Sequence, residues 1–227
     1  MEPTKILTIN LFDIKVPNNV KLFLNFLNGA KDLARENKAL FDKEDIPIDI
    51  FHNKEITYSG IQFSRYKGSA SFTAIGEKEV IALQLWYDLF QKNTEIPLLN
   101  TQIINETYTP ILGQDFYYYK LSNFLVKKEI HNEIKGLKNQ LAKIDRLEKY
   151  LYGNIRTFLE HHLGYEFQKD DFISVKIDSF TNNGFKDTYH EGSLKAYLIK
   201  FKTNVYLPQT LRLGQSAALG YGIVQHV

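Results

Sequence analysis

The spacing of apolar side chains in the first half of the chain changes from one segment to the next. Alternation every second residue, with many β-branched residues, is typical of strands, whereas apolar residues three and four positions apart indicate a helix. Gly68 separates two alternating stretches and predicts a hairpin turn. The predicted order is strand, helix, hairpin, helix and strand, over residues 5–14, 20–41, 61–76, 77–92 and 101–112.

The second half nearly repeats this order, with a short piece over 209–218 in place of the second helix, and without repeating the sequence. Apolar residues recur at helical spacing over 125–163, where Gly136 and Gly153 are expected to divide the helix. The chain is therefore predicted to be an α+β protein of tandem ferredoxin-like (RRM-like) units with antiparallel sheets and a long helical segment in the second. The expected units are residues 1–112 and 113–227. Strands of the second unit are predicted over 115–124, 171–180, 193–208 and 221–227.

Composition narrows the possible chemistry. The 227 residues are 44% hydrophobic and 24% charged, as in an ordinary globular protein. The absence of cysteine excludes disulfides, thiolate nucleophiles and cysteine-ligated zinc. The six histidines form no HExxH pattern, so neither a metal nor another cofactor is expected. No apolar run approaches the roughly 20 residues that span a bilayer, and the amino-terminal residues do not resemble a signal peptide. We therefore expect a cytoplasmic protein without a membrane partner.

Positive charge is concentrated in one segment of a chain whose formal net charge is only +2. Residues 120–150 contain eight Lys or Arg and four Asp or Glu, so this segment alone carries +4 (8 − 4). A local excess of this kind attracts phosphate groups. A solvated helix face is the commoner reason for such a pattern, and both interpretations stay open.

Three glycines lie close together near the end of the sequence: Gly214, Gly220 and Gly222. Tyr221 follows Gly220 where a P-loop requires lysine, and the segment precedes a strand where a Rossmann fingerprint precedes a helix. Both nucleotide-binding motifs are therefore excluded. Two interpretations remain: a tight turn or bulge leading into the last strand, or a backbone that comes close to a phosphate.

This segment resembles the glycine-rich loop of the CRISPR-associated RNA-processing endonucleases of the RAMP superfamily. That loop has the pattern G-Φ-G-x5-G-Φ-G, with Φ apolar, shortly before the carboxyl end. Here Gly214 is followed by the five residues QSAAL and then by Gly220-Tyr221-Gly222, and Arg212 stands at the place of the first glycine. The resemblance implies that Arg212 presents a guanidinium to a passing RNA phosphate.

Two further segments resemble one subfamily of these enzymes. In residues 51–68, His52 and Asn53 precede Tyr58 and the triplet Ile61-Gln62-Phe63, but Lys54 replaces the second histidine of a His-Asn-His pattern. Without the resemblance, His52 is more simply a surface or hydrogen-bonding residue, and Pro47 predicts irregular structure nearby. In residues 147–165, Leu151-Tyr152-Gly153-Asn154-Ile155 matches a helix pattern of the subfamily. We interpret that stretch as a packed amphipathic helix whose small residue allows close contact.

The resemblance implies a metal-independent endoribonuclease that cleaves CRISPR repeat RNA to guide RNAs by attack of the 2′-OH and leaves a 2′,3′-cyclic phosphate. It implies catalytic roles for His52 as base or acid, Lys54 as the charge stabiliser and Tyr58 as a donor to phosphate. The tyrosines at 117–119 are candidates for base stacking, although alternation places Tyr118 on the opposite face from its neighbours. The predicted RNA-binding residues are Lys127, Lys128, Arg212, Gly214, Gln215, Gly220 and Gly222.

Partners and alternatives follow from the same residues. The expected partner is CRISPR repeat RNA, with other CRISPR effector subunits and a homodimer as further possibilities. One alternative is a non-catalytic RNA-binding RAMP subunit of an effector complex, which Lys54 at a histidine position favours. The other is a protein-interaction module, which the near-heptad spacing over 125–163 favours.

Overall fold

The computed structural model describes residues 2–16, 20–51, 58, 60–95, 97–187 and 192–227. The chain divides into two compact units. The first unit is Met1–Thr109 together with Ala218–Gly220, and the second is Pro110–Ala217 together with Tyr221–Val227. Each unit contains one four-stranded antiparallel sheet.

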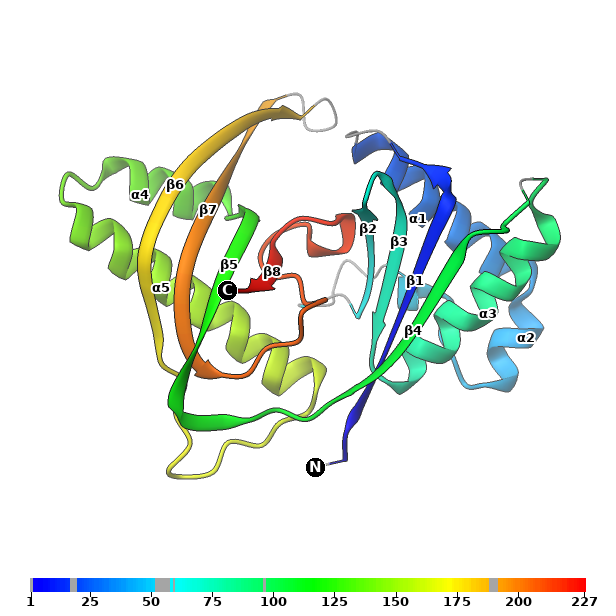
Figure 1. The fold of residues 1–227 in the computed structure, drawn as a ribbon, viewed down its shortest axis with the longest axis horizontal. Coiled ribbons are helices and arrows are strands. Elements are labelled where there is room, and N and C mark those ends of the chain that lie inside the picture. Colours follow the sequence, from blue (N-terminus) through cyan, green and yellow to red (C-terminus); the bar gives the residue numbers. More distant parts are fainter. Residues whose placement is uncertain (1, 17–19, 52–57, 59, 96, 188–191) are drawn as a thin grey trace. The chain divides into compact units, whose positions relative to one another are not determined.

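The first unit has helices on one face of its sheet (Figure 1). The strands lie in the order β2-β3-β1-β4, as expected for a ferredoxin-like unit. Lys67 and Gly68 connect β2 to β3 with φ of 49° and 84°, which is the left-handed turn that suits the twist of a two-residue hairpin. The elements are β1 (Thr4–Lys15), α1 (Val20–Glu36), α2 (Lys38–Lys43), a 3-10 turn (Ile48–Phe51), β2 (Ile61–Tyr66), β3 (Ser69–Ile75), α3 (Glu77–Asn93) and β4 (Thr101–Tyr108).

Alternation in the strands separates an apolar face from a polar face in this sheet. Ile9 and Phe72 are paired across β1 and β3 and belong to the core beneath the helices. Trp86 of α3 packs against Phe72 with ring centroids 4.7 Å apart. In β1 and β3, the residues next to Ile9 and Phe72 point to the other face of the sheet. Thr8 and Thr73, paired in the same two strands, hold their hydroxyls 3.3 Å apart there.

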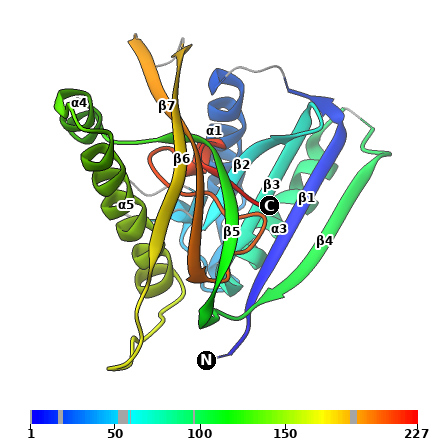
Figure 2. The ribbon, with the colours of Figure 1, turned by 60° about the vertical axis from the view of Figure 1, so that its left-hand side comes forward.

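The second unit has the strand order β6-β7-β5-β8. Figure 2 shows α4 and α5 on one side of β6 and β7. The second helix of a ferredoxin-like unit is replaced by an irregular segment that includes the glycines, with a 3-10 turn at Ala217–Leu219. The remaining elements are β5 (Leu112–Leu125), α4 (Lys128–Gly136), α5 (Gln140–Thr157), a π turn (Phe158–His162), β6 (Val175–Asp187), β7 (Gly192–Val205) and β8 (Ile223–His226).

The structure confirms the α+β class and the tandem ferredoxin-like arrangement of antiparallel strands. Gly136 ends α4 as expected, and Asn139 starts α5 by accepting a hydrogen bond from the backbone N of Leu141 at 2.8 Å. The expected break at Gly153 is wrong, because α5 continues through it to Thr157. Among the described residues, no helix is long and apolar enough to cross a membrane.

Candidate functional site

Of the three predicted catalytic residues, the structure describes Tyr58, whereas His52 and Lys54 lie outside the described residues. The Tyr58 side chain is only 8% exposed, and its hydroxyl accepts a hydrogen bond from Nε2 of Gln62 at 2.8 Å. Gln62 itself is fully buried in β2. The conspicuous Gln62 in the apolar-Gln-aromatic triplet therefore holds the Tyr58 hydroxyl.

The position of Gln62 follows from the alternation of β2. Ile61 and Phe63 point into the core beneath the helices, so Gln62 points to the polar face of the first sheet. Gln62 is paired with Thr73 of β3, and Ser64 is paired with Ser71. All four of these polar side chains are at most 4% exposed. A buried amide requires hydrogen-bonding neighbours, and this face supplies them.

The glycine-rich turn meets the end of β5 at Gly214. Its φ of +93° lies in the left-handed region that favours glycine. A Cβ on Gly214 would lie 2.6 Å from the ring of Phe124 and 2.7 Å from the carbonyl oxygen of Leu125. The next residue, Gln215, donates its backbone N–H to that same carbonyl at 3.0 Å. Close packing on β5 thus excludes every larger residue at position 214.

Gly222 is constrained in the same way by Leu213, the residue before Gly214. Its φ is +70°, and a Cβ would overlap the carbonyl of Leu213. Its backbone N donates to the carbonyl of Asn123 at 2.9 Å, and its carbonyl accepts from the N of Leu213 at 2.9 Å. Gly220, which belongs to the first unit, has a φ of +85° and would place a Cβ 2.9 Å from the carbonyl oxygen of Phe63. Backbone conformation and packing within the chain therefore account for glycine at all three positions.

Asn154 joins the helix motif to the glycine-rich turn. Its Oδ1 accepts a hydrogen bond from the backbone N of Gly214 at 3.0 Å, and its Nδ2 donates to the carbonyl of Tyr150 at 2.7 Å. The sequence analysis includes Asn154 in the helix pattern but assigns it no role of its own. The available signal was a poor helix former in mid-helix, which is unusual unless its amide is used elsewhere. The two segments, 60 residues apart, thus form one structural feature.

Gly153 does not have the role that we expected. A Cβ at this position would meet no atom within 4 Å among the described residues. The interpretation of Gly153 as a small residue needed for close contact inside the chain is therefore wrong. Its neighbours Leu151 and Ile155 are fully buried, which confirms the amphipathic part of that interpretation.

Arg212 and Gln215 lie in different environments although they are close in sequence. Arg212 is 7% exposed, its backbone forms a bridge with Ile223, and its Nη1 donates to the carbonyl of Thr210 at 3.0 Å. Gln215 is exposed. The described structure thus places the guanidinium against the chain and leaves Gln215 as the accessible polar side chain of the turn.

The basic segment presents most of its charge to solvent. Lys127 and Lys128 are exposed at the first residues of α4. Cations are unfavourable at this end of a helix, so helix stability does not explain them. Of the eight basic residues over 120–150, those with an ion pair in the described part of the chain are Arg146, with Glu133, and Lys149, with Asp145. The other lysines keep their charge available to an anion.

The three tyrosines of β5 have three different roles. Tyr119 is 1% exposed, and its hydroxyl donates to the carbonyl of Val205 at 3.2 Å and accepts from the backbone N of Leu207 at 2.8 Å. Tyr117 is half-buried with its ring 5.3 Å from that of Tyr206. Tyr118 is 53% exposed on the opposite face. Of the three, only Tyr118 offers an open ring to a ligand.

A basic and aromatic surface surrounds Tyr118 on the second sheet. Nζ of Lys202 lies 5.5 Å from the ring centroid of Phe116 and 5.8 Å from that of Tyr118. The register places Tyr118, Lys202 and Lys176 side by side across three strands. Lys120 and Lys200 are paired in the next row on the same face. Sequence reasoning missed this surface, although alternation in LIKFK over 198–202 already places Lys200 and Lys202 opposite the apolar core.

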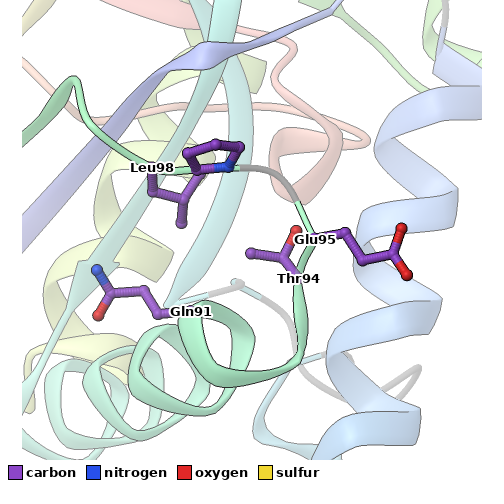
Figure 3. A pocket seen from close by; sticks show the side chains of 5 residues that line it. Gln91, Thr94, Glu95 and Leu98 are labelled. Atoms are coloured by element: carbon purple, nitrogen blue, oxygen red, sulfur yellow. The ribbon is translucent and has the colours of Figure 1, made fainter.

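Charge distinguishes this surface from a cavity of the first unit. A pocket of about 360 Å³ lies at the end of α3 and is lined by Gln91, Thr94, Glu95, Pro97 and Leu98. Figure 3 shows these side chains from close by. Its one charged lining residue is an acid, which repels phosphate. Within the described ranges, no group of three or more His, Asp or Glu side chains is arranged to hold a metal ion.

Comparison with known proteins agrees with this fold. The family model of the Cas6b C-terminal domain matches residues 111–227. The chain is similar to a crystal structure of Cas6b, with a TM-score of 0.74 and 19% identity, and to one of the CRISPR RNA processing endoribonuclease Cas6b, with 0.70 and 17%. It is also similar to Csf5, a type IV Cas6 crRNA endonuclease, with 0.60 and 11%. Each match covers 100% of both chains. No sequence among the curated proteins matches.

Proposed function

Because the chain belongs to the Cas6b family, we propose that it is an endoribonuclease that cleaves CRISPR repeat RNA to release guide RNAs. Its fold is that of the Cas6-type CRISPR RNA processing endoribonucleases. The observation that carries the proposal is the family match over residues 111–227. That range includes both Gly214 and Asn154, whose hydrogen bond fixes the glycine-rich turn.

The proposed reaction uses the nucleophile that RNA itself carries. A base removes the proton of the 2′-OH, the 2′ oxygen attacks the adjacent phosphorus, and the bond from phosphorus to the 5′ oxygen breaks. An acid protonates the departing 5′ oxygen. The products are a 2′,3′-cyclic phosphate and a 5′-OH, and the scheme requires no metal. His52 is proposed as base or acid because an imidazole exchanges protons near neutral pH.

Lys54 and Tyr58 have supporting roles in this proposal. The ammonium of Lys54 stabilises the charge that develops on the phosphate oxygens, in place of the family histidine. Tyr58 orients the phosphate. The hydrogen bond from Gln62 supports a fixed position for the Tyr58 hydroxyl, because Gln62 is itself held in β2.

Substrate binding is proposed for three surfaces. The exposed Lys127 and Lys128 attract the RNA backbone at the start of α4. The glycine-rich turn, with Arg212, Gly214, Gln215, Gly220 and Gly222, is proposed to hold the RNA. The basic and aromatic surface around Tyr118 and Lys202 accepts unpaired bases, because stacking on an open ring tolerates any base and lysines neutralise the phosphates.

The test is cleavage of end-labelled repeat RNA from the same genome in buffer with EDTA. Wild type is compared with His52→Ala, Lys54→His and His161→Ala. His161 is exposed on the π turn and serves as the matched control. We expect one cut by wild type and by His161→Ala, a loss of at least about a hundredfold in His52→Ala, and retained or increased activity in Lys54→His.

The product end identifies the reaction. A 2′,3′-cyclic phosphate resists phosphatase until it is opened, whereas a 3′-phosphate is removed directly. Cleavage that stops in EDTA would refute the metal-independent scheme. Tight, salt-sensitive binding without a cut would instead support the non-catalytic RNA-binding subunit, which Lys54 at a histidine position favours. If Lys54→His then cleaves the RNA, the lysine at position 54 is the reason why the wild type does not. Sedimentation of the same samples tests for a homodimer, and mixing with other CRISPR effector subunits tests for assembly.

A further inference from the structure

The second unit contains a pocket that none of the proposed catalytic or RNA-binding residues lines. It has a volume of about 290 Å³ and lies where α4 and the first turn of α5 cover β6 and β7. Figure 1 shows both helices on that face of the strands. Its lining includes His131, Lys135, Lys143, Phe180, Asn182 and Tyr197.

The floor of the pocket is fixed. Tyr197 is 1% exposed, and its hydroxyl lies 2.9 Å from Nδ1 of His131. The ring centroid of Phe180 lies 6.1 Å from that of Tyr197. Burial raises the pKa of Tyr197, so its hydroxyl stays protonated at neutral pH. Aromatic rings on α4, β6 and β7 therefore form a rigid wall.

The rim of the pocket is positive. Lys135 is exposed and Lys143 is half-buried, and neither has an ion pair with an acid among the described residues. Glu133, two residues before Lys135 in α4, is already bound by Arg146. The lining includes no Asp or Glu. Among the described residues, these two cations thus face the cavity without a counter-ion.

These features together select one class of ligand. Lysine binds phosphate as a point charge, an aromatic wall stacks a base, and the amide of Asn182 can both donate to and accept from a base edge. An apolar ligand would leave the two ammonium groups without partners. A phosphate alone would make no stacking contact with the aromatic rings. The volume is at the lower end for ligand pockets, which suits one nucleotide and excludes a duplex.

We propose that this pocket binds one unpaired nucleotide, with its phosphate on Lys135 and Lys143 and its base against Phe180. The proposal rests on the proposed function, because it assigns that nucleotide to the RNA substrate, outside the bond that is cut. A nucleotide within RNA and a free mononucleotide both offer a base joined to a phosphate, so either could fill this pocket. The experiment separates the two sources.

The test pairs Lys135→Gln/Lys143→Gln with Lys138→Gln/Lys169→Gln. Both double variants remove two positive charges, but Lys138 and Lys169 are exposed and do not line the pocket. We expect the pocket variant to bind single-stranded repeat RNA about tenfold more weakly, since contacts to charged groups are strong. The slope of log affinity against log salt should fall by about 0.7, as for one lost phosphate contact. The control pair should change neither quantity.

A second readout locates the base. Repeat RNA with 5-iodouridine at single positions is irradiated with the wild-type protein, and the crosslinked peptide is identified by mass spectrometry. The proposal expects one position outside the cleavage site to crosslink at Phe180, and expects that crosslink to be lost in the pocket variant. The cleavage rate at saturating RNA should be equal in all three proteins, because the pocket lies outside the proposed catalytic residues.

The outcomes separate this inference from the proposed function. Wild type that binds and cuts RNA, with equal affinity, slope and crosslinking in both double variants, overturns the pocket and leaves the function intact. If wild type neither binds nor cuts RNA, AMP and UMP are titrated and followed by NMR. Binding of AMP or UMP that is lost in the pocket variant then supports a free nucleotide as ligand and overturns the assignment to RNA. No binding of either nucleotide overturns the inference together with the function.

Discussion

Replacement of Gly222 by alanine tests whether the glycine-rich turn is required by the chain's own packing. Gly222 has a left-handed backbone, which costs another L-residue roughly 1–2 kcal/mol. Its added Cβ would also overlap the carbonyl of Leu213. Relief of that overlap disturbs two backbone hydrogen bonds of 2.9 Å, each with a net worth of about 0.5–1.5 kcal/mol. Gly222→Ala should therefore lower the free energy of unfolding of the second unit by about 2–5 kcal/mol.

The matched control is Gly153→Ala. Gly153 lies inside α5, and its added Cβ would meet no atom within 4 Å among the described residues. Alanine is a better helix former than glycine by about 1 kcal/mol, so this variant should be stabilised by up to that amount. The two glycine-to-alanine changes should thus have opposite signs.

The assay is urea unfolding followed separately in each unit. Trp86, the chain's single tryptophan, reports the first unit by fluorescence. Far-UV circular dichroism and hydrogen exchange of peptides from residues 206–227 report the second. An unchanged urea midpoint and unchanged exchange in Gly222→Ala would refute the packing argument. If Gly153→Ala is more stable yet binds RNA less well, the space beside Gly153 serves the approach of substrate.

Three further predictions follow from named contacts. Asn154→Ala removes the acceptor for the N–H of Gly214 and should cost about 0.5–2.5 kcal/mol, after a gain of about 0.5 kcal/mol in helix propensity; faster exchange of the Gly214 amide is the readout, and Asn154→Asp should keep it slow. Tyr119→Phe leaves the buried N–H of Leu207 without its acceptor and should cost about 1–3 kcal/mol, measured by thermal unfolding; an equal Tm would contradict this. Burial raises the pKa of Glu79 in the folded state, so the charged carboxylate is disfavoured there at neutral pH. Glu79→Gln should therefore be more stable than the wild type at pH 7. This difference in the free energy of unfolding should disappear as the pH falls through the raised pKa toward the ordinary value.

The elements could be predicted from local pattern where periodicity was long and strong. The strand at 5–14 and the helix at 77–92 are observed as Thr4–Lys15 and Glu77–Asn93. Boundaries failed where tertiary contacts override propensity. Gly153 does not interrupt α5, because the buried side chains on either side of it, Leu151 and Ile155, hold the helix together.

The contacts of the site could not be predicted from local pattern because they join distant residues. Nothing in the sequence near Asn154 indicates that its amide meets Gly214, and nothing near Tyr58 indicates which partner fixes its hydroxyl. The resemblance identified all three segments as related features of one family, but it attached the glycines to RNA alone. The structure adds that Gly214 and Gly222 also fill positions where the backbone of the second unit leaves no room for a side chain.

The same distinction separates Arg212 from the three glycines of the turn. Gly214, Gly220 and Gly222 all have positive φ, and a Cβ at each would meet backbone or ring atoms at 2.9 Å or less. Arg212 is not among the described residues with positive φ, and it forms a β-bridge with Ile223, so its backbone accepts any side chain. Glycine therefore stands at the three positions where the left-handed backbone and the close packing require it, and position 212 has neither requirement. The arginine at this position instead donates a hydrogen bond from Nη1 to the carbonyl oxygen of Thr210 at 3.0 Å.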